Sequence, residues 1–403
     1  MSIGSGSGDG GQAPPSVVPD IPYVRSRDAG EQRATFFELF FDLVYVFAIT
    51  QLSHLLLTDL SWAVAGETAF LLLAVYWAWN YTTWMTNWFD PETTAVRLVL
   101  VFVMLASLLM AVAIPEGFGD QALLFAVAYC GLQIGRNGFV VAVTPPGPFH
   151  RNFGQILAWS VLSTPLWIAG ALVDGGGRWG LWLAALALDL AAPIARYWLP
   201  GVGRTPMSDW QIDPAHFAER FQLLVIIVLG ESIVLTGSAA SGTGLDTPVL
   251  VALGLALLAS AALWWLYFGQ LTSSARRRIT ADELPGQVGR DAYTYLHFPI
   301  VAGILLTAVG DELVIAHPDD VLTTAEALVL LGGPALYLFG VVIFGVRVGR
   351  HQAWPRLVAV ALLLAAVPLA TEPRRVVVAG LATLLLAALV VADQLGVGHD
   401  ARD

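Results

Sequence analysis

Long apolar runs separated by short polar connections dominate the sequence from residue 36 onward. Each run approaches the length of about 20 residues that an α-helix needs to cross the hydrocarbon core of a bilayer. The connections are rich in Pro, Gly and Asp, which favour turns. The pattern predicts twelve membrane-spanning helices: Phe36 to Leu57, Trp62 to Trp84, Ala95 to Ile114, Gln121 to Val143, Phe153 to Val173, Trp179 to Leu199, Phe217 to Gly237, Thr247 to Leu271, Tyr293 to Val314, Ala325 to Val346, Pro355 to Leu369 and Arg374 to Leu395.

The expected fold class is therefore an all-α, polytopic transmembrane bundle, with Pro355 to Leu369 too short to settle as a full span. Composition agrees, because 57% of the 403 residues are hydrophobic, only 13% are charged and the mean hydropathy is +0.69. Soluble proteins are about 45–50% apolar and about 25% charged. Much of the net charge of −11 comes from acidic loops and termini, and the sequence shows no basic surface suited to nucleic acid, so we expect no nucleic-acid partner. A single cysteine, Cys130, excludes an intramolecular disulfide.

The arginines predict the orientation, since basic residues are retained on the cytoplasmic side of short loops. With the amino-terminal tail inside, thirteen arginines fall on the inside and only three, Arg178, Arg374 and Arg375, fall outside. Both termini are therefore expected in the cytoplasm. Residues 1–35 are Gly/Ser/Pro-rich up to about Pro22 and show no signal-peptide pattern, so they are predicted to form a disordered cytosolic tail.

A partial internal repeat divides the chain. The stretch Thr35–Ile49 is echoed by Phe217–Glu231, and setting Glu38 on Glu219 also matches Phe40 with Phe221. Six predicted spans precede the repeated stretch at Phe217 and six begin with it. The first span of each half starts on the cytoplasmic side, so the two repeats are predicted to be parallel. The predicted units are a first six-helix half at 36–200, a cytosolic connection at 201–216, a second half at 217–395 and a short cytosolic tail at 396–403.

Ionisable residues inside these spans are the candidate functional groups. Glu38 and Asp42 lie four residues apart and share one helix face. A rise of 1.5 Å per residue places eight ionisable side chains in the cytoplasmic half: Glu38, Asp42, Arg97, Arg136, Arg196, His216, Glu219 and Arg220. Such groups are costly in hydrocarbon and should face inward and pair. We expect the acids of the first span to pair with Arg97, Arg136 or Arg220.

Two interpretations of these charges stay open. They either form a structural ion-pair network that fixes helix docking, or they line a polar pathway in which Asp42 or Glu38 changes protonation as an ion or solute moves. Glu231 and Asp189 lie deeper, and function and structure are equally favoured for them. His297 is expected to be a hydrogen-bonded core histidine. The candidate coupling acids are thus Glu38, Asp42, Glu231 and Asp189, and the candidate charge partners are Arg97, Arg136, Arg196, Arg220, His216 and Glu219.

Signals for catalysis are weak. The sequence lacks Gly-x-Ser-x-Gly, His-Glu-x-x-His, phosphate-loop and dinucleotide motifs. Asp311, Glu312, His317, Asp319 and Asp320 have metal-ligand residue types, but their spacing fits no defined site and favours a solvated loop. We therefore expect no enzyme activity, no catalytic residue, no metal and no cofactor.

Two motifs carry a family likeness: Glu38-Leu-Phe-Phe-Asp-Leu-Val44, and His216-Phe-Ala-Glu-Arg-Phe221 followed by Ile226-Ile-Val-Leu-Gly-Glu-Ser-Ile233. The chain resembles the bacterial low-temperature-requirement A family of polytopic membrane proteins over most of its membrane region. The resemblance implies a bacterial cytoplasmic-membrane protein linked to growth in the cold, and it implies no established reaction.

The favoured hypothesis is a secondary transporter, or a proton- or ion-translocating protein, that uses buried carboxylates. Its partners would be the bilayer and a small solute, cation or proton. The alternative is a membrane structural or cold-stress protein that does not transport and that binds lipid. A lipid-modifying enzyme would need a nucleophile or metal that the sequence does not offer.

Overall fold

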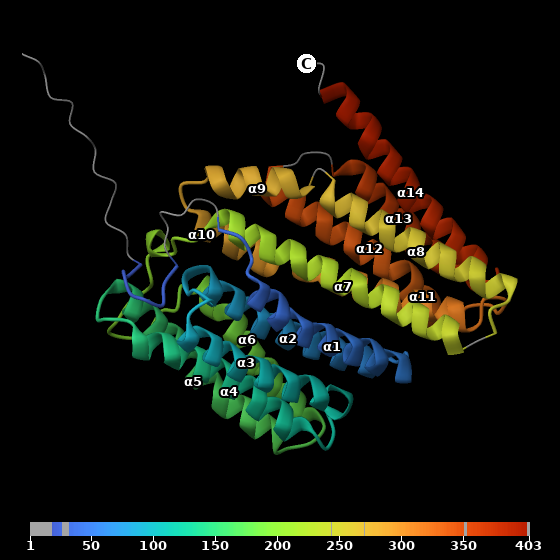
Figure 1. Ribbon diagram of the computed structural model, residues 1–403. Coiled ribbons are helices and arrows are strands. Elements are labelled where there is room, and N and C mark those ends of the chain that lie inside the picture. Colours follow the sequence, from blue (N-terminus) through green and yellow to red (C-terminus); the bar gives the residue numbers. More distant parts are fainter. Residues whose placement is uncertain (1–17, 26–31, 243, 270, 350–352, 401–403) are drawn as a thin grey trace, which may run out of the picture.

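The computed structural model describes residues 18–25, 32–242, 244–269, 271–349 and 353–400, and in these ranges every regular element is helical (Figure 1). The first half holds α1 (Phe36–Thr58), α2 (Trp62–Trp88), α3 (Thr94–Ala113), α4 (Ala122–Val143), α5 (Pro148–Ala171) and α6 (Gly176–Ile194). The second holds α7 (Pro214–Gly242), α8 (Thr247–Phe268), α9 (Leu271–Ala281), α10 (Pro285–Val288), α11 (Phe298–Ala316), α12 (Thr324–Arg347), α13 (Trp354–Ala366) and α14 (Arg375–Asp400). Short helices are η2 (Ile114–Glu116), η3 (Met207–Asp209), the π-helical η4 (Gly289–Tyr295) and η5 (Val367–Leu369).

The all-helical membrane fold predicted from the sequence is confirmed. Within the described ranges, nine helical segments are long and apolar enough to cross a bilayer, namely those built on α1, α2, α3, α4, α7, α8, α11, α12 and α14. Of the other three predicted spans, α5 and α6 are not among these nine segments, and α13 with η5 forms a shorter apolar segment, Trp354–Leu369. The count of twelve spans and the two repeats thus stay predictions.

If successive helices cross the membrane in opposite directions, every second loop lies on the same side. The structure brings the loops of each such set together. At one end, Asn87 in the last turn of α2 bonds Asp213 before α7, and Asn152 at the start of α5 bonds Asp209. At the opposite end, Arg178 at the start of α6 donates to the carbonyls of Phe118 and Gly119, which join α3 to α4. Hence α5 and α6 run between the same two ends as the more apolar helices.

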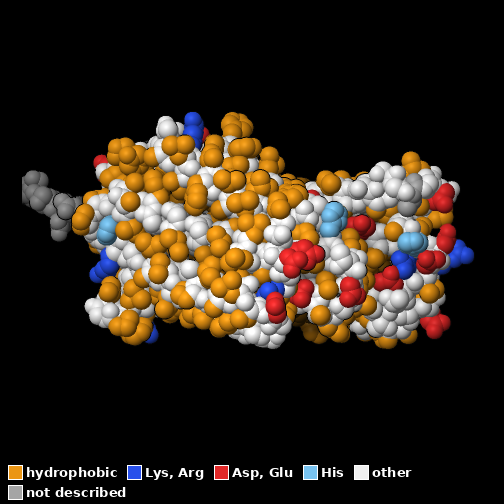
Figure 2. Space-filling model, turned by 90° about the horizontal axis from the view of Figure 1, so that it is seen from below, with side chains coloured by type: hydrophobic (Ala, Val, Ile, Leu, Met, Phe, Trp, Pro, Cys, Tyr) orange, Lys and Arg blue, Asp and Glu red, His pale blue; other side chains and the backbone are white. Residues whose placement is uncertain are grey.

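The surface fits a lipid environment. Figure 2 shows hydrophobic side chains over a broad part of the visible face, while acidic side chains gather toward one end. Helix α3, for example, exposes a row of large apolar side chains: Leu98, Val101, Phe102, Leu105, Leu108, Leu109 and Val112. An apolar surface of this extent is unfavourable in water and favourable against lipid tails.

The two halves meet where α1 and α2 pack against α7 and α11. Helix α1 is central, because it also contacts α2 and α3 of its own half. Helix α11 also packs closely against α12. A Cβ atom added at Gly303 would lie 2.3 Å from the backbone nitrogen of Tyr337, and one at Gly333 would lie 2.5 Å from that of Thr307. Small residues thus bring α11 and α12 into backbone contact, a common device in membrane helix packing.

The two predicted tails need correction where the structure describes them. Residues 1–17 and 26–31 lie outside the described residues, but Val24 forms an antiparallel bridge with Phe89, and the Arg25 N–H donates to the Trp88 carbonyl at 2.9 Å. This part of the predicted disordered tail therefore packs against the end of α2. At the other end of the chain, α14 continues to Asp400 beyond the predicted limit of residue 395.

Candidate functional site

A buried charged cluster occupies the interface between the two halves, one turn inside the start of α1 and α7. We call Arg25, Glu38, Asp42, His216 and Arg220 the inner cluster. Glu38, Asp42, His216 and Arg220 are all fully buried, and the Arg25 side chain is 9% exposed. The two carboxylates come from α1, and His216 and Arg220 come from the same face of α7, also four residues apart.

Glu38 joins the start of α1 to two other segments, the stretch that holds Arg25 and helix α7. Its Oε2 accepts from Arg25 Nη2 at 2.8 Å and from the Thr35 N–H at 2.8 Å, and Thr35 Oγ1 in turn accepts from the Glu38 N–H. This reciprocal pair is a capping box, which explains why the helix begins at Phe36. Glu38 Oε1 lies 2.9 Å from His216 Nε2 of α7. One carboxylate therefore caps its own helix and also binds the other half.

Asp42 is held by a two-point ion pair. Arg220 donates from Nη1 to Oδ2 and from Nη2 to Oδ1, both at 2.7 Å, and Trp79 Nε1 donates to Oδ1 at 2.9 Å. The guanidinium also lies 5.8 Å from the centre of the Trp79 ring. A planar guanidinium matches a carboxylate in this bidentate geometry, which makes it the strongest form of such a pair.

The side-chain amide of Asn87 orients the His216 ring. Asn87 Oδ1 accepts from the Asp213 N–H at 2.8 Å, and Asn87 Nδ2 donates to the Asp213 carbonyl at 3.0 Å. The same Nδ2 lies 3.0 Å from His216 Nδ1. Because an amide nitrogen only donates, Nδ1 accepts, and Nε2 carries the hydrogen that it donates to Glu38. The inner cluster thus holds two guanidinium and two carboxylate groups, which balance in charge.

A second group of ionisable side chains lies farther along the same interface. We call His54 of α1, Glu231 of α7 and Glu312 of α11 the outer cluster. Glu231 faces Thr50, His54 and Glu312. It is only 1% exposed, yet its Oε1, like Oε2 of Glu312, is buried and finds no hydrogen-bond partner in the described part of the chain. Neither carboxylate has an ion pair with a described arginine.

Apolar packing separates the two clusters. Arg220 and Glu231 stand 11 residues apart on α7, which is roughly 16 Å along the helix axis. The side chains buried between them come from α7 and α1: Leu224, Val225, Val228, Ala48, Ile49 and Leu52. The interface therefore has a polar group at each end and an apolar barrier in the middle.

Of the three partners expected for the first-span acids, Arg220 pairs with Asp42, whereas Arg97 and Arg136 do not pair with either acid. Arg97 lies at the rim with its side chain 45% exposed and pairs with Glu92 at 2.6 Å. Arg136 is fully buried, but it bonds Gln133, Thr82 and the Ala78 carbonyl. Depth along the membrane normal is similar for all these groups, but pairing also depends on which helix faces which. Among the predicted basic partners in the described structure, Arg220 and His216 of α7 are those that bond the acids of α1.

The other predicted residues lie apart from the inner cluster. Glu219 accepts from the Ala34 N–H at 3.0 Å at the inner end. Asp189 accepts from Tyr129 Oη at 2.9 Å and from Trp167 Nε1 at 3.0 Å, so neutral donors surround it, and Arg196 does not reach it. His297 is buried, stacks on Tyr293 and lies 2.6 Å from Tyr267 Oη.

Three groups of functional interest were missed from the sequence. Arg25 was assigned to a disordered tail, where it is one of three arginines close to the first span, with Arg27 and Arg33. Asn87 and Trp79 gave no signal, since both look like ordinary members of an aromatic helix. Asp311 and Glu312 were assigned to a solvated loop, but α11 continues to Ala316 and Asp311 is buried.

The described residues contain no group of three His, Cys, Asp or Glu side chains able to hold a metal ion. The outer cluster has only two carboxylates and one imidazole from three helices, and the inner carboxylates are already used by arginines. The arrangement can exchange protons or bind a cation between helices.

Comparison with known proteins places this geometry in a family. Residues 33–392 match the family described as bacterial low temperature requirement A protein. An uncharacterized protein of Rhizobium meliloti (strain 1021) is 34% identical over 379 residues, which cover 94% of this chain and 93% of that protein. No solved structure matches the chain.

Proposed function

The chain belongs to the bacterial low temperature requirement A family, and from this premise we propose that it moves protons or another cation across the membrane. The pathway follows the interface that α1 forms with α7 and α11. Glu231 and Glu312 receive the ion at the outer end, and Glu38 and Asp42 handle it at the inner end. We further propose that it has no enzymatic activity.

One observation carries this proposal. Glu231 is a buried carboxylate in a membrane helix, and one of its oxygens lacks any hydrogen-bond partner among the described residues. Leaving such a group unsatisfied costs about 1–3 kcal/mol, and a structural role would favour a paired or apolar side chain. A carboxylate that binds a proton or cation in one stage of a cycle needs this unfilled coordination.

The inner cluster supplies a way to link protonation to movement of the halves. The ion pair of Asp42 with Arg220 joins α1 to α7, so it bridges the two halves directly. Neutralising Asp42 would leave the guanidinium only its longer contact with Glu38, in which Nε lies 3.8 Å from Oε1. Breaking one partner of a buried pair costs about 3–5 kcal/mol. Proton transfer to this carboxylate would therefore favour separation of the halves at the inner end.

The finer architecture supports an alternating mechanism. We propose twelve spans in two parallel six-helix repeats, with both termini in the cytoplasm of a bacterial inner membrane. Helix packing recurs in the two halves, because α1 packs on α2 and α3, α3 on α4 and α4 on α5, while α7 packs on α8 and α11, α11 on α12 and α12 on α13. Parallel repeats of this kind move against each other in many transporters.

A second candidate is a membrane structural or cold-stress protein that does not transport. The complete pairing of the inner cluster favours it, since Glu38 and Asp42 have ion pairs that would by themselves fix the docking of α1 on α7. This candidate explains the inner cluster well and leaves the outer cluster without a role.

Purified protein in proteoliposomes that contain a pH-sensitive dye would test the proposal. We expect wild-type protein to dissipate an imposed gradient of protons or of one monovalent or divalent cation. Asp42→Asn should lose this flux while still eluting as folded protein, and Glu92→Gln, at an exposed carboxylate, should retain it. Absence of wild-type flux across protons and several cations would favour the structural candidate.

A further inference from the structure

A short segment ahead of α1 lies across the inner end of α2. We call residues 18–25 the strap. Beside the bridge between Val24 and Phe89, the Tyr23 carbonyl accepts a hydrogen bond from the Asp90 N–H at 2.8 Å. The strap is therefore held at the end of α2 by backbone pairing of the kind that joins two β-strands. It can detach without the unfolding of a helix.

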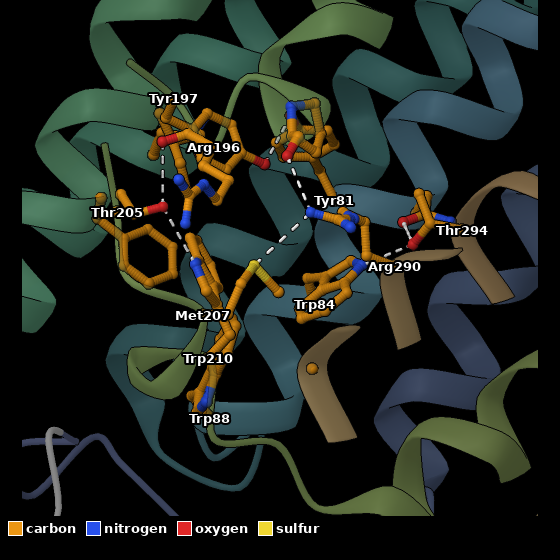
Figure 3. Close-up of a pocket in the computed structure, with 16 residues that line it drawn as sticks. Tyr81, Trp84, Trp88, Arg196, Tyr197, Thr205, Met207, Trp210, Arg290 and Thr294 are labelled. Atoms are coloured by element: carbon orange, nitrogen blue, oxygen red, sulfur yellow. Dashed lines mark hydrogen bonds between the residues drawn. The ribbon is translucent and has the colours of Figure 1, made fainter. Parts of the chain in front are cut away.

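The end of α2 that receives the strap is braced by aromatic rings. The Trp88 ring is centred 5.7 Å from that of Trp84 and 5.8 Å from that of Trp210. Trp88 Nε1 also donates to the Gln211 carbonyl at 2.5 Å. The three rings line the cavity of about 40 Å³ that is drawn in Figure 3. The strap, by contrast, buries only Val18 among its eight residues, so it is the weaker side of this contact.

Arg25 carries the positive charge of the strap to Glu38. Its Nε donates to the Thr86 carbonyl at 2.9 Å, which directs the guanidinium inward, and its Nη2 donates to Glu38 Oε2 at 2.8 Å. Among the five side chains of the inner cluster, only that of Arg25 keeps any exposure to solvent, 9%, and that of Glu38 has none. The Arg25 side chain therefore covers the Glu38 carboxylate at the inner end.

Both Glu38 oxygens are occupied while the strap is in place. Oε2 accepts from Arg25 and from the Thr35 N–H, and Oε1 accepts from His216. Thr35 caps α1 and His216 belongs to α7, whereas Arg25 lies on the strap. Removal of Arg25 would leave Glu38 with an unneutralised charge and a free acceptor position, and a proton or cation needs both.

We propose that the strap closes the inner end of the pathway. With Arg25 seated, water and ions from the inner side do not reach Glu38, and release of the strap exposes this carboxylate. A proton delivered to Glu38 along the pathway cancels the charge that holds Arg25, so the strap opens as the cargo arrives. This inference rests on the proposed function, but access to Glu38 can be measured without flux.

Carboxylate labelling of the purified full chain would test access to Glu38. The reagents are a water-soluble carbodiimide and glycine ethyl ester, and peptide mass spectrometry would locate the label. Glu92, whose side chain is 57% exposed, is the internal reference, and we expect Glu38 to label far more slowly in wild type. Asp42 is fully buried, so it should stay unlabelled in every variant that remains folded.

Arg25→Gln should raise the labelling rate of Glu38 relative to Glu92. Loss of a hydrogen bond between charged groups shifts an equilibrium about tenfold to a hundredfold, and we expect an increase of this size. Arg33→Gln, at an exposed arginine that also precedes α1, is the matched control and should leave the ratio unchanged.

A disulfide across the bridge should have the opposite effect. The hydrogen bonds flank Val24 and Phe89 and do not join them. The Cα atoms of such a pair lie about 4.5 Å apart, which a disulfide can span. Val24→Cys and Phe89→Cys would be added to Arg25→Gln, with Cys130→Ser to prevent mispairing. Oxidation should suppress the raised labelling of Glu38, and reduction should restore it.

Three results would overturn the proposal. They are wild-type labelling of Glu38 as fast as that of Glu92, an unchanged ratio in Arg25→Gln, and labelling that does not respond to the disulfide. None of these ratios depends on flux. A wild-type protein that carries no ion would therefore contradict the proposed function, while the labelling would still decide whether the strap closes the site.

Discussion

The inner and outer clusters lie on one helix interface but treat their carboxylates differently. At the inner end, Asp42 accepts three hydrogen bonds, two of them from Arg220. At the outer end, Glu231 keeps one buried oxygen without a partner among the described residues. We propose that the same residue chemistry serves two purposes. A paired carboxylate stabilises the contact between the halves, and an unpaired one is available to a proton or cation.

The largest loss of stability is expected when Arg220, the base that pairs with Asp42 in the inner cluster, is replaced. Arg220→Leu leaves the Asp42 carboxylate buried without its charge partner, and we expect a loss of about 3–5 kcal/mol in stability. The midpoint of thermal unfolding in detergent should fall sharply. Arg97→Leu is the matched control, and because that side chain is 45% exposed, it should change the midpoint little. If both variants unfold alike, the inner ion pair does not stabilise the interface.

Removing both partners sharpens the same point. In Asp42→Asn combined with Arg220→Leu no charge of the pair remains buried, so the double variant should be more stable than Arg220→Leu alone. A coupling energy of about 1–3 kcal/mol is expected from the thermal midpoints of the four proteins in the cycle. Additive losses would mean that the two side chains act independently.

A smaller effect is expected at Glu38. Glu38→Gln keeps an oxygen that can accept from the Thr35 N–H, but it removes the negative charge beside Arg25 and His216. Hydrogen bonds to charged groups contribute about 1.5–3 kcal/mol, but both capping-box bonds should survive, since the second is donated by the backbone N–H of residue 38. The midpoint of thermal unfolding should fall by less than in Arg220→Leu. An equally large fall would mean that Glu38 contributes as much to the stability of the interface as Arg220 does.

The smallest stability effect should come from the outer end. Glu231→Gln and Glu312→Gln each replace a carboxylate that leaves one oxygen unpaired in the described structure, so little is lost. We expect thermal midpoints within about 0.5 kcal/mol of wild type, or slightly higher. A large destabilisation of either variant would show that its carboxylate has a structural partner.

Helix positions follow closely from the sequence, because the length of an apolar run is set by the bilayer. The predicted span Phe36 to Leu57 differs from α1 (Phe36–Thr58) by one residue. The acids Glu38 and Asp42 were also recognised, because charge inside an apolar run is conspicuous. Both features depend only on residues that are close together in the sequence, so they can be recognised without the three-dimensional structure.

Partner choice could not be predicted in the same way. Arg97 and Arg220 lie at similar depths, and only the docking of α7 on α1 decides which reaches Asp42. The contact of Arg25 with Glu38 depends on the packing of residues 18–25 against the end of α2. The outer cluster joins residues of α1, α7 and α11, which are about 80 to 260 positions apart in sequence. Such contacts appear only when the helices are assembled.

Ion flux in Glu231→Gln tests the central claim most directly. The variant and Glu92→Gln would be reconstituted in parallel, at equal protein density, with the ion that wild-type protein carries. The account predicts that Glu231→Gln folds as stably as wild type and loses the flux, while Glu92→Gln keeps it. Wild-type flux in Glu231→Gln would contradict the account, because ions would then cross without the unpaired carboxylate.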